Sequence, residues 1–399
     1  EVISAAGWSS RRIDVLRLLH DYSRARYGKS VRGVDRFWRG MLGSAYGEFT
    51  NNARFRWQLR PLSRRMATMG VNEHYFEAIE EFLGAASELG KAPNYRTDAI
   101  QYAAFYLAGK ADILLDAAVW AAMHGETEQA ARCERRFLAL LREADRLLAS
   151  HPLLRLERWN EQARAAGCSE EERDRFVREQ RRLISVWGGP SLSDYSARIW
   201  SGPIRDFYIP RWRNFFAALN EGRSFDFRSW DEGWHQTDTL SRVKPFAEPL
   251  TAACKLVEAT RDISPEMVQR PERAVCCWLP FDFAQERTRV SFTIGHEEFR
   301  RMRGLRFTAL RGSEPVTLEK LRITARRHHP AQKSPRPPAS RHCWAEQEPA
   351  LRIEPGSDGV TLRVEKRDVE APLAKEFTVT LTLHGRPAAD NYTAVELLY

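Results

Sequence analysis

The spacing of apolar residues changes once along this chain of 399 residues, and that change limits what the chain can fold into. Up to about residue 262, apolar residues recur three and four positions apart, as in Val34, Phe37, Trp38 and Met41, which is the spacing of one helix face. From about residue 274 they occur instead in short β-rich runs separated by Gly, Pro, Asp and Asn. We therefore predict an antiparallel α-helical bundle over residues 1–262, followed by an antiparallel β-sandwich over residues 263–399.

Several helices of the first part are predicted from their ends. Residues 74–89 and 97–123 are long and apolar-periodic, and Gly125 is a plausible stop for the second. Ser169 begins a capping box before a helix that runs to Trp187. Two further helix starts are predicted, at Ser191, which would cap its helix, and at Pro210, which would start a helix at Arg211.

The second part contains seven runs that predict strands. These are Val275–Leu279, Val290–Ile294, Leu305–Leu310, Leu321–Thr324, Val360–Val364, Phe377–Leu383 and Val395–Leu397. Residues 329–340 are rich in proline and basic residues, and we expect them to form a long surface loop.

Composition excludes several classes of protein. The net charge is +9 and the isoelectric point about 9.4, but arginines alternate with acids, as in residues 170–175, and no nucleic-acid motif accompanies them. We therefore expect no nucleic-acid partner. The six cysteines show no C-x-x-C pattern, so we expect no metal and no cofactor. No apolar run reaches the roughly 18 residues that a membrane span needs.

The most distinctive segment lies near the middle of the chain and is rich in arginine and aromatic residues. Its landmarks are Arg181, Trp187-Gly188, Asp194-Tyr195, Gly202 and Tyr208-Ile209-Pro210-Arg211-Trp212. This spaced pattern resembles the C-terminal helical region of the α-N-acetylglucosaminidases, glycoside hydrolase family 89. The resemblance covers roughly residues 5–245, and the β-rich tail is similar in layout to sandwiches appended to bacterial glycoside hydrolases.

The resemblance implies a retaining glycosidase that works with two glutamates on an upstream (β/α)8 barrel. Both lie before Gly7, so we assign no catalytic residue in this chain and expect it to be inactive alone. Because the chain begins with Glu1 and not with Met, we expect it to be part of a longer protein. Family members act outside the cytoplasm, in the periplasm, the medium or a lysosome-like compartment.

The resemblance also implies that Trp187, Leu192 and Tyr195 line the substrate pocket, against N-acetylglucosamine or its acetamido group. Spacing alone favours instead a core residue at a helix end for Trp187. Arg181 and Arg211 are interpreted as structural, since a buried arginine can fork onto carbonyls or a carboxylate and fix a turn. Asp194 is a candidate partner for Arg181, or a cap for its own helix.

Three functional hypotheses remain at this level. The first is that the chain completes the active site of an exo-acting glycoside hydrolase that removes terminal α-linked N-acetylglucosamine from glycans. The second is a glycan-binding or scaffolding module without chemistry. The third is a basic interaction protein for anionic polymers, either heparan-type glycans or nucleic acid. The sequence leaves a homo-oligomer open.

Overall fold

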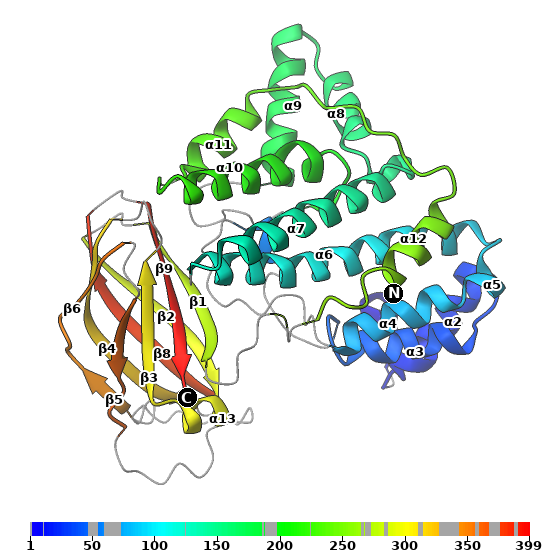
Figure 1. Cartoon of the computed structure of the whole chain (residues 1–399). Helices are drawn as coiled ribbons and strands as arrows, with labels where there is room; N and C mark the ends of the chain where they lie inside the picture. The colour runs from blue at the N-terminus through cyan, green and yellow to red at the C-terminus, as the bar shows by residue number, and fades with distance from the viewer. Residues whose placement is uncertain are drawn as a thin grey trace.

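The computed structural model separates a helical part from a part built of two β-sheets (Figure 1). It describes residues 2–10, 12–46, 55–59, 73–123, 125–185, 187, 198–223, 225–264, 267, 273–282, 286–309, 314–326, 343–355, 359–366, 376–386 and 390–399. The predicted loop at 329–340 lies outside these residues. None of the helices described is long and apolar enough to cross a membrane.

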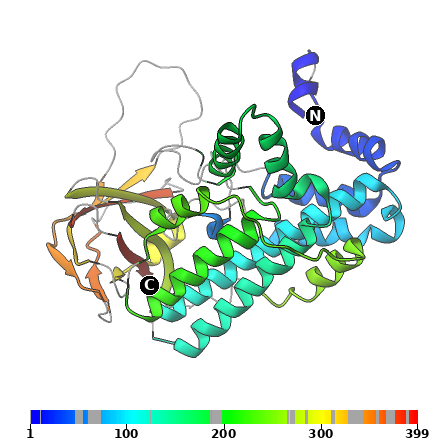
Figure 2. The same cartoon turned by 90° about the horizontal axis from the view of Figure 1, so that it is seen from above.

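The helical part ends with α12 and contains helices of very different length. They are α1 (Val2–Trp8), α2 (Val15–Tyr27), α3 (Arg32–Leu42), α4 (Glu73–Gly84), α5 (Ala86–Leu89), α6 (Pro93–Met123), α7 (Thr127–Leu148), α8 (Leu156–Ala165), α9 (Glu170–Ile184), α10 (Ile209–Asn220), α11 (Phe227–His235) and α12 (Pro249–Glu258). Short turns η1 (Arg56–Gln58) and η2 (Pro152–Leu154) and a π-helical turn η4 (Pro203–Tyr208) lie between them. Seen from above, α1 projects from the body of the molecule (Figure 2).

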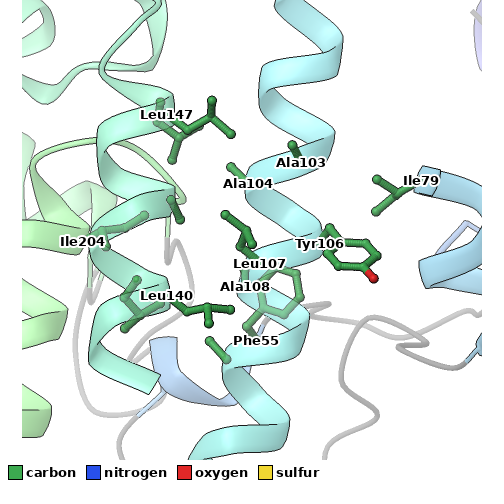
Figure 3. Close-up of a cluster of buried hydrophobic side chains, with 14 of the residues drawn as sticks. Phe55, Ile79, Ala103, Ala104, Tyr106, Leu107, Ala108, Leu140, Leu147 and Ile204 are labelled. Atoms are coloured by element: carbon green, nitrogen blue, oxygen red, sulfur yellow. The ribbon is translucent and has the colours of Figure 1, made fainter. Parts of the chain in front are cut away.

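Helix α6 is the centre of the helical part. It packs against α4, α7 and α12, and it is apolar on nearly every side, as expected of a helix surrounded by others. Ala104 and Ala108 let α7 approach closely, with Leu140 and Leu147 filling the contact, while Tyr106 lies on the side nearest α4 (Figure 3). The predicted stop at Gly125 is confirmed by its left-handed backbone (φ 73°).

A short segment, η1, lies against α6 and is held there by hydrogen bonds. Asp112 of α6 accepts the backbone N–H groups of Arg56 (2.9 Å) and Trp57 (3.0 Å). Trp57 has no exposed surface, and its indole N–H donates to the carbonyl of Ala108 (3.2 Å). Asp112 therefore satisfies two backbone donors that the turn would otherwise bury unpaired.

The β-rich part forms two antiparallel sheets with one apolar core between them. The strands are β1 (Arg273–Asp282), β2 (Arg287–Gly295), β3 (Gly304–Ala309), β4 (Val316–Arg326), β5 (Cys343–Gln347), β6 (Leu351–Ile353), β7 (Val360–Arg363), β8 (Glu376–His384) and β9 (Asp390–Leu398), with one short helix, α13 (His296–Arg301). One sheet has the order β1-β9-β3-β7, and the other β2-β8-β4-β5 with β6 beside β4. All seven predicted runs are strands.

The sequence missed some elements and misplaced others. It set no bounds for α1, α7, α8, α11, α12, α13, β5 or β6. It also made one helix of residues 74–89, which a turn at Ala85 divides into α4 and α5. The helix expected after Ser191 lies mostly outside the described residues, and residues 198–200 are not helical. Pro210 does lie in the first turn of a helix, but helical structure already begins at Pro203, because the π-helical turn runs directly into α10.

The contact between η1 and α6 yields the first prediction. Asp112→Ala removes both carboxylate oxygens and leaves two buried N–H groups without an acceptor, so we expect a loss of about 3 kcal/mol in the free energy of unfolding. Urea unfolding followed by circular dichroism measures it. Asp116→Ala, which removes a half-exposed partner of Arg56 one turn away, is the control and should cost less than about 1 kcal/mol. Equal losses would contradict the role given to Asp112.

Candidate functional site

Trp187 lies just beyond α9, whose last residue is Ile184, so the helix ends earlier than the predicted end at Trp187. The backbone conformation of Trp187 is unusual for a tryptophan. Its φ of 68° lies in the left-handed region, where glycine is the usual residue at a helix end. Its backbone N–H donates to the carbonyl of Arg182 (2.7 Å), which closes the last turn. The side chain is 40% exposed. A bulky residue held at positive φ costs of order 1–3 kcal/mol, and such strain clusters at functional sites.

The start of α9 positions this end. Ser169 caps the helix by accepting the N–H of Glu172 (3.2 Å), as predicted. The carboxylate of Glu172 reaches one residue further back than in a standard capping box and accepts the N–H of Cys168 (2.9 Å). Three glutamates in the first turn suit the positive end of the helix dipole.

Arg181 fixes the end of α9 to the segment after α11. It has no exposed surface, and its guanidinium donates to the carbonyls of Trp234 (3.2 Å) and Thr239 (3.1 Å) and to the hydroxyl of Thr237 (2.6 Å). It also lies 4.7 Å from the centre of the Trp234 ring. Burial lowers the pKa of Arg181 below its ordinary value. Because its partners are carbonyls and a hydroxyl of residues 234–239, Arg181 holds the end of α9 against this segment.

A buried histidine adds a second link at the same place. Nε2 of His235 lies 2.8 Å from the hydroxyl of Ser185, and that hydroxyl donates to the carbonyl of Arg181 (2.7 Å). The serine oxygen therefore accepts from Nε2–H, which makes His235 a neutral donor. Nδ1 lies 3.8 Å from Glu232, too far for a hydrogen bond. Burial lowers the pKa of His235 to about 4, with the positive charge of Arg182 acting in the same direction and Glu232 opposing it.

Arg211 forms the other fixed point and also has no exposed surface. Its guanidinium donates to the carbonyl of Gln58 in η1 (2.9 Å) and lies 3.4 Å from the carboxylate of Asp231. Next to it, the indole N–H of Trp212 donates to the carbonyl of Trp57 (2.6 Å). Both arginines therefore make buried contacts to the chain, and their role in supporting a substrate pocket stays a prediction.

Gly202 is the landmark whose residue type has a clear steric reason. Its φ is 104°, and a Cβ at this position would lie 2.7 Å from Cβ of Leu156. Its N–H donates to Asp145 (2.9 Å), which also pairs with Arg205 (2.9 Å). Asp145 is almost fully buried, and burial raises its pKa while Arg205 lowers it. Glycine at position 202 therefore lets the backbone pass close to Leu156, the first residue of α8.

The structure does not describe the remaining site residues predicted from the sequence. Leu192, Asp194 and Tyr195 lie outside the described residues, so their roles stay predictions. The sequence indicated no role for Ser185, Asp231, Glu232 or His235. In the structure Asp231 pairs with Arg211, Glu232 pairs with Arg182, and the His235 ring contacts Ser185.

The chemistry available at this site is limited. Asp231 is buried against Arg211, and Glu232 pairs with Arg182 (3.1 Å). Neither is free to protonate a leaving group or attack a carbon. Arginines and carbonyls hold a rigid frame, and Trp187 presents an aromatic ring at its edge. Aromatic rings of this kind cover the apolar C–H faces of sugars at little entropic cost. The place of Trp187 in a substrate pocket stays a prediction.

The helical part belongs to a known class of domain, the C-terminal domain of α-N-acetylglucosaminidases. Residues 18–259 match the family model described as the alpha-N-acetylglucosaminidase (NAGLU) C-terminal domain. This chain belongs to that family.

Known relatives extend well beyond the matched region. Human alpha-N-acetylglucosaminidase is 28% identical over 265 residues, which are 62% of this chain and 35% of the human protein. The family 89 glycoside hydrolase of Clostridium perfringens, solved with GlcNAc-α-1,4-galactose, matches with a TM-score of 0.56 and 24% identity over 64% of this chain and 32% of its own. The same hydrolase solved with PUGNAc matches with a TM-score of 0.56 and 23% sequence identity, over 64% of this chain and 32% of its own. These structures show the shared fold, and the chain spans about a third of the length of the relatives it matches.

The buried histidine yields a prediction about pH. In the unfolded chain His235 binds a proton below about pH 6.5, whereas in the native state it does so only below about 4. The unfolded state therefore binds more protons in this window, and the free energy of unfolding should fall as pH decreases from 6.5 to 4, by up to roughly 3 kcal/mol.

His235→Gln should remove that part of the pH dependence, whereas His74→Gln, which changes an exposed imidazole, should leave it intact. Urea unfolding of the three proteins at pH 7, 5.5 and 4.5 measures it. If the free energy of unfolding of wild type and of His235→Gln changes with pH in the same way, His235 is not held neutral.

Proposed function

We propose that this chain is the C-terminal portion of an α-N-acetylglucosaminidase, an exo-acting hydrolase that removes terminal α-linked N-acetylglucosamine from glycans. In this proposal, residues 1–262 supply one wall of the substrate pocket and residues 263–399 form an ancillary β-sandwich. Trp187, Leu192 and Tyr195 line the pocket, and Arg181, Asp194 and Arg211 support it. The two catalytic glutamates lie on a barrel that precedes residue 1 in the same polypeptide.

The observation that carries the proposal is the conformation of Trp187. A glycine would end α9 without strain, and a buried tryptophan would contribute more to the core. The chain instead holds a partly exposed indole at positive φ and fixes the helix end behind it with Arg181. Strain and exposure at one residue are poorly explained by packing, and they are well explained by contact with a ligand.

The relatives support the chemistry and the setting. The human relative is an α-N-acetylglucosaminidase, and the clostridial relative was solved with a disaccharide that carries α-linked GlcNAc. From the same family we propose that the protein acts outside the cytoplasm. Glycans with terminal α-N-acetylglucosamine are the proposed ligands.

Substitutions at Trp187 in the longer protein test the proposal. We expect Trp187→Ala to lower kcat/KM for p-nitrophenyl N-acetyl-α-glucosaminide at least about tenfold, because the indole that holds the sugar is lost, while the melting temperature changes little. Trp187→Gly should lose as much turnover, but it should be more stable than Trp187→Ala by about 1 kcal/mol, because glycine tolerates positive φ.

Leu153→Ala, at another exposed apolar residue, serves as the control and should leave turnover unchanged. Loss of stability in proportion to loss of activity would favour a packing role for Trp187 and overturn its assignment to the pocket.

The second candidate function is a glycan-binding or scaffolding module without chemistry. It is favoured by the arginine-held carboxylates of the described site, neither of which is arranged as an acid or nucleophile. The two functions differ in what the longer protein does. The present chain should not hydrolyse the p-nitrophenyl substrate, whereas a protein that includes the upstream barrel should. If the longer protein binds GlcNAc-terminated glycans and never cleaves them, the binding function holds instead.

A further inference from the structure

The β-sandwich carries a groove that the proposed hydrolysis does not use. It has a volume of about 470 Å³, within the range of sites that bind small ligands. It lies where α13 leads into β3 and where β9 ends near the C-terminus (Figure 1). Its described lining consists of Met302, Arg303, Gly304, Thr361, Arg363, Val364, Lys366 and Leu398. All of these residues lie beyond the matched family region, which ends at residue 259.

The strand register explains why the surface is hollow here. Gly304 of β3 pairs with Arg363 of β7 on one side and with Leu398 of β9 on the other. Leu305 and Phe307 point into the core, so Gly304 belongs to the outer face of the sheet. Arg363, Gly304 and Leu398 thus lie side by side across three strands. Because Gly304, in the middle, has no side chain, a depression remains between Arg363 and Leu398. A Cβ at Gly304 would lie 2.8 Å from the carbonyl of Leu362, so the position stays empty.

The rim of the groove is positively charged. Arg303 and Arg363 are both exposed, and among the described residues no carboxylate lies within ion-pair distance of either guanidinium. Their backbones are fixed, since Arg303 donates its N–H to Leu398 (2.7 Å) and accepts from Val364 (3.0 Å). The strand pairing thus places both arginines beside Gly304 at fixed backbone positions.

Lys366 adds a third charge that is held in place. Its ammonium donates to the carbonyls of Phe299 (2.6 Å) and Arg300 (3.1 Å) at the end of α13, and it lies 4.9 Å from the centre of the Phe299 ring. Burial lowers its pKa from the ordinary value near 10.5. Glu396 of β9, which pairs with Arg306 of β3, is fully buried, and its carboxylate lies 3.9 Å from the Arg306 guanidinium.

The floor of the groove is apolar. Met302 and Val364 are buried beneath it, and Leu398 forms one side. A suitable ligand therefore carries negative charge at its edges and an apolar face toward the sheet. Small inorganic anions have no such face. A saccharide that bears carboxylate or sulfate groups has both, because its ring presents C–H groups while its substituents carry the charge.

We propose that this groove binds an acidic saccharide, with Arg303 and Arg363 contacting its carboxylate or sulfate groups. The choice of a saccharide over another polyanion rests on the proposed function of the chain. The binding itself does not, because it needs no catalytic barrel. The sandwich would then hold acidic glycans near the enzyme through a surface separate from the Trp187 wall.

Calorimetric titration of the present chain tests this site with four probes of similar length. They are a sulfated heparin hexasaccharide, a hyaluronan hexasaccharide that carries only carboxylates, neutral maltohexaose and a hexanucleotide RNA. We expect one or both acidic saccharides to bind and maltohexaose to bind at least tenfold more weakly. Arg303→Ala and Arg363→Ala should each weaken binding about tenfold, since each removes charge-assisted hydrogen bonds. Comparison of the two acidic probes identifies sulfate or carboxylate as the preferred group.

Two controls locate the binding. Arg289→Ala removes an exposed arginine from β2 in the other sheet and should leave affinity unchanged. A Lys333→Ala/Arg336→Ala double variant removes charge from the basic segment 329–340 and should have little effect. If this double variant abolishes binding while Arg303→Ala does not, that segment is the site and the groove proposal fails. Tighter binding of RNA, lost in the groove variants, would replace the saccharide with nucleic acid.

The tests of the groove and of the proposed hydrolase function can fail independently of each other. In the longer protein, Arg303→Ala and Arg363→Ala should leave turnover of the neutral p-nitrophenyl substrate unchanged. Saccharide binding without turnover would support the groove and refute the hydrolase, and turnover without saccharide binding would do the reverse. Equal melting temperatures of the variants exclude unfolding as the cause of lost binding.

Discussion

Two arginine side chains with no exposed surface organise the helical part of this protein. Taking a guanidinium out of water is costly unless its hydrogen bonds are satisfied, so wherever such a group is buried the surrounding chain must supply acceptors. Arg181 obtains them from the segment that follows α11, and Arg211 from Asp231 and from η1. Helix α11 is therefore fixed at its middle, through Asp231, and at its C-terminal end, through Trp234.

This arrangement links the edge of the candidate site to the core. The Trp187 N–H meets the carbonyl of Arg182 at the end of α9. From the neighbouring Arg181 the contacts run to the end of α11, along that helix to Asp231, and through Arg211 to η1. Asp112 then fixes η1 to α6, the helix at the centre of the bundle. The exposed indole thus sits at the end of a continuous polar frame, and that frame keeps a strained backbone conformation in place.

The sandwich obeys different constraints. Its core is apolar, and seven of its strands were predicted from short β-rich runs, yet its most distinctive feature arises from a single missing side chain. Gly304 leaves a hollow between neighbouring strands, and the arginines beside it face outward without a described acidic partner. The helical part and the sandwich therefore present two chemically distinct surfaces, one aromatic and one basic.

Some of this was readable in the sequence because it depends on local pattern. Apolar spacing identified most helices and all seven predicted strands, and the landmarks from Arg181 to Trp212 identified the family. Glu172 and Ser169 defined the start of α9 because capping is a contact between close neighbours. Helix α7 was missed although its pattern is regular, and the short β5 and β6 were missed because they offer too few residues for a period to emerge.

The sequence by itself determined the order of elements, the change from helix to strand and the membership of a glycosidase family. Only the tertiary structure decided which partners the buried arginines take, that Trp187 adopts a left-handed backbone, and that a basic groove forms around Gly304. The physical reason is distance along the chain. Arg181 meets residues more than fifty positions away, Arg211 meets Gln58 at a separation of 153, and Arg363, Gly304 and Leu398 become neighbours only through strand pairing.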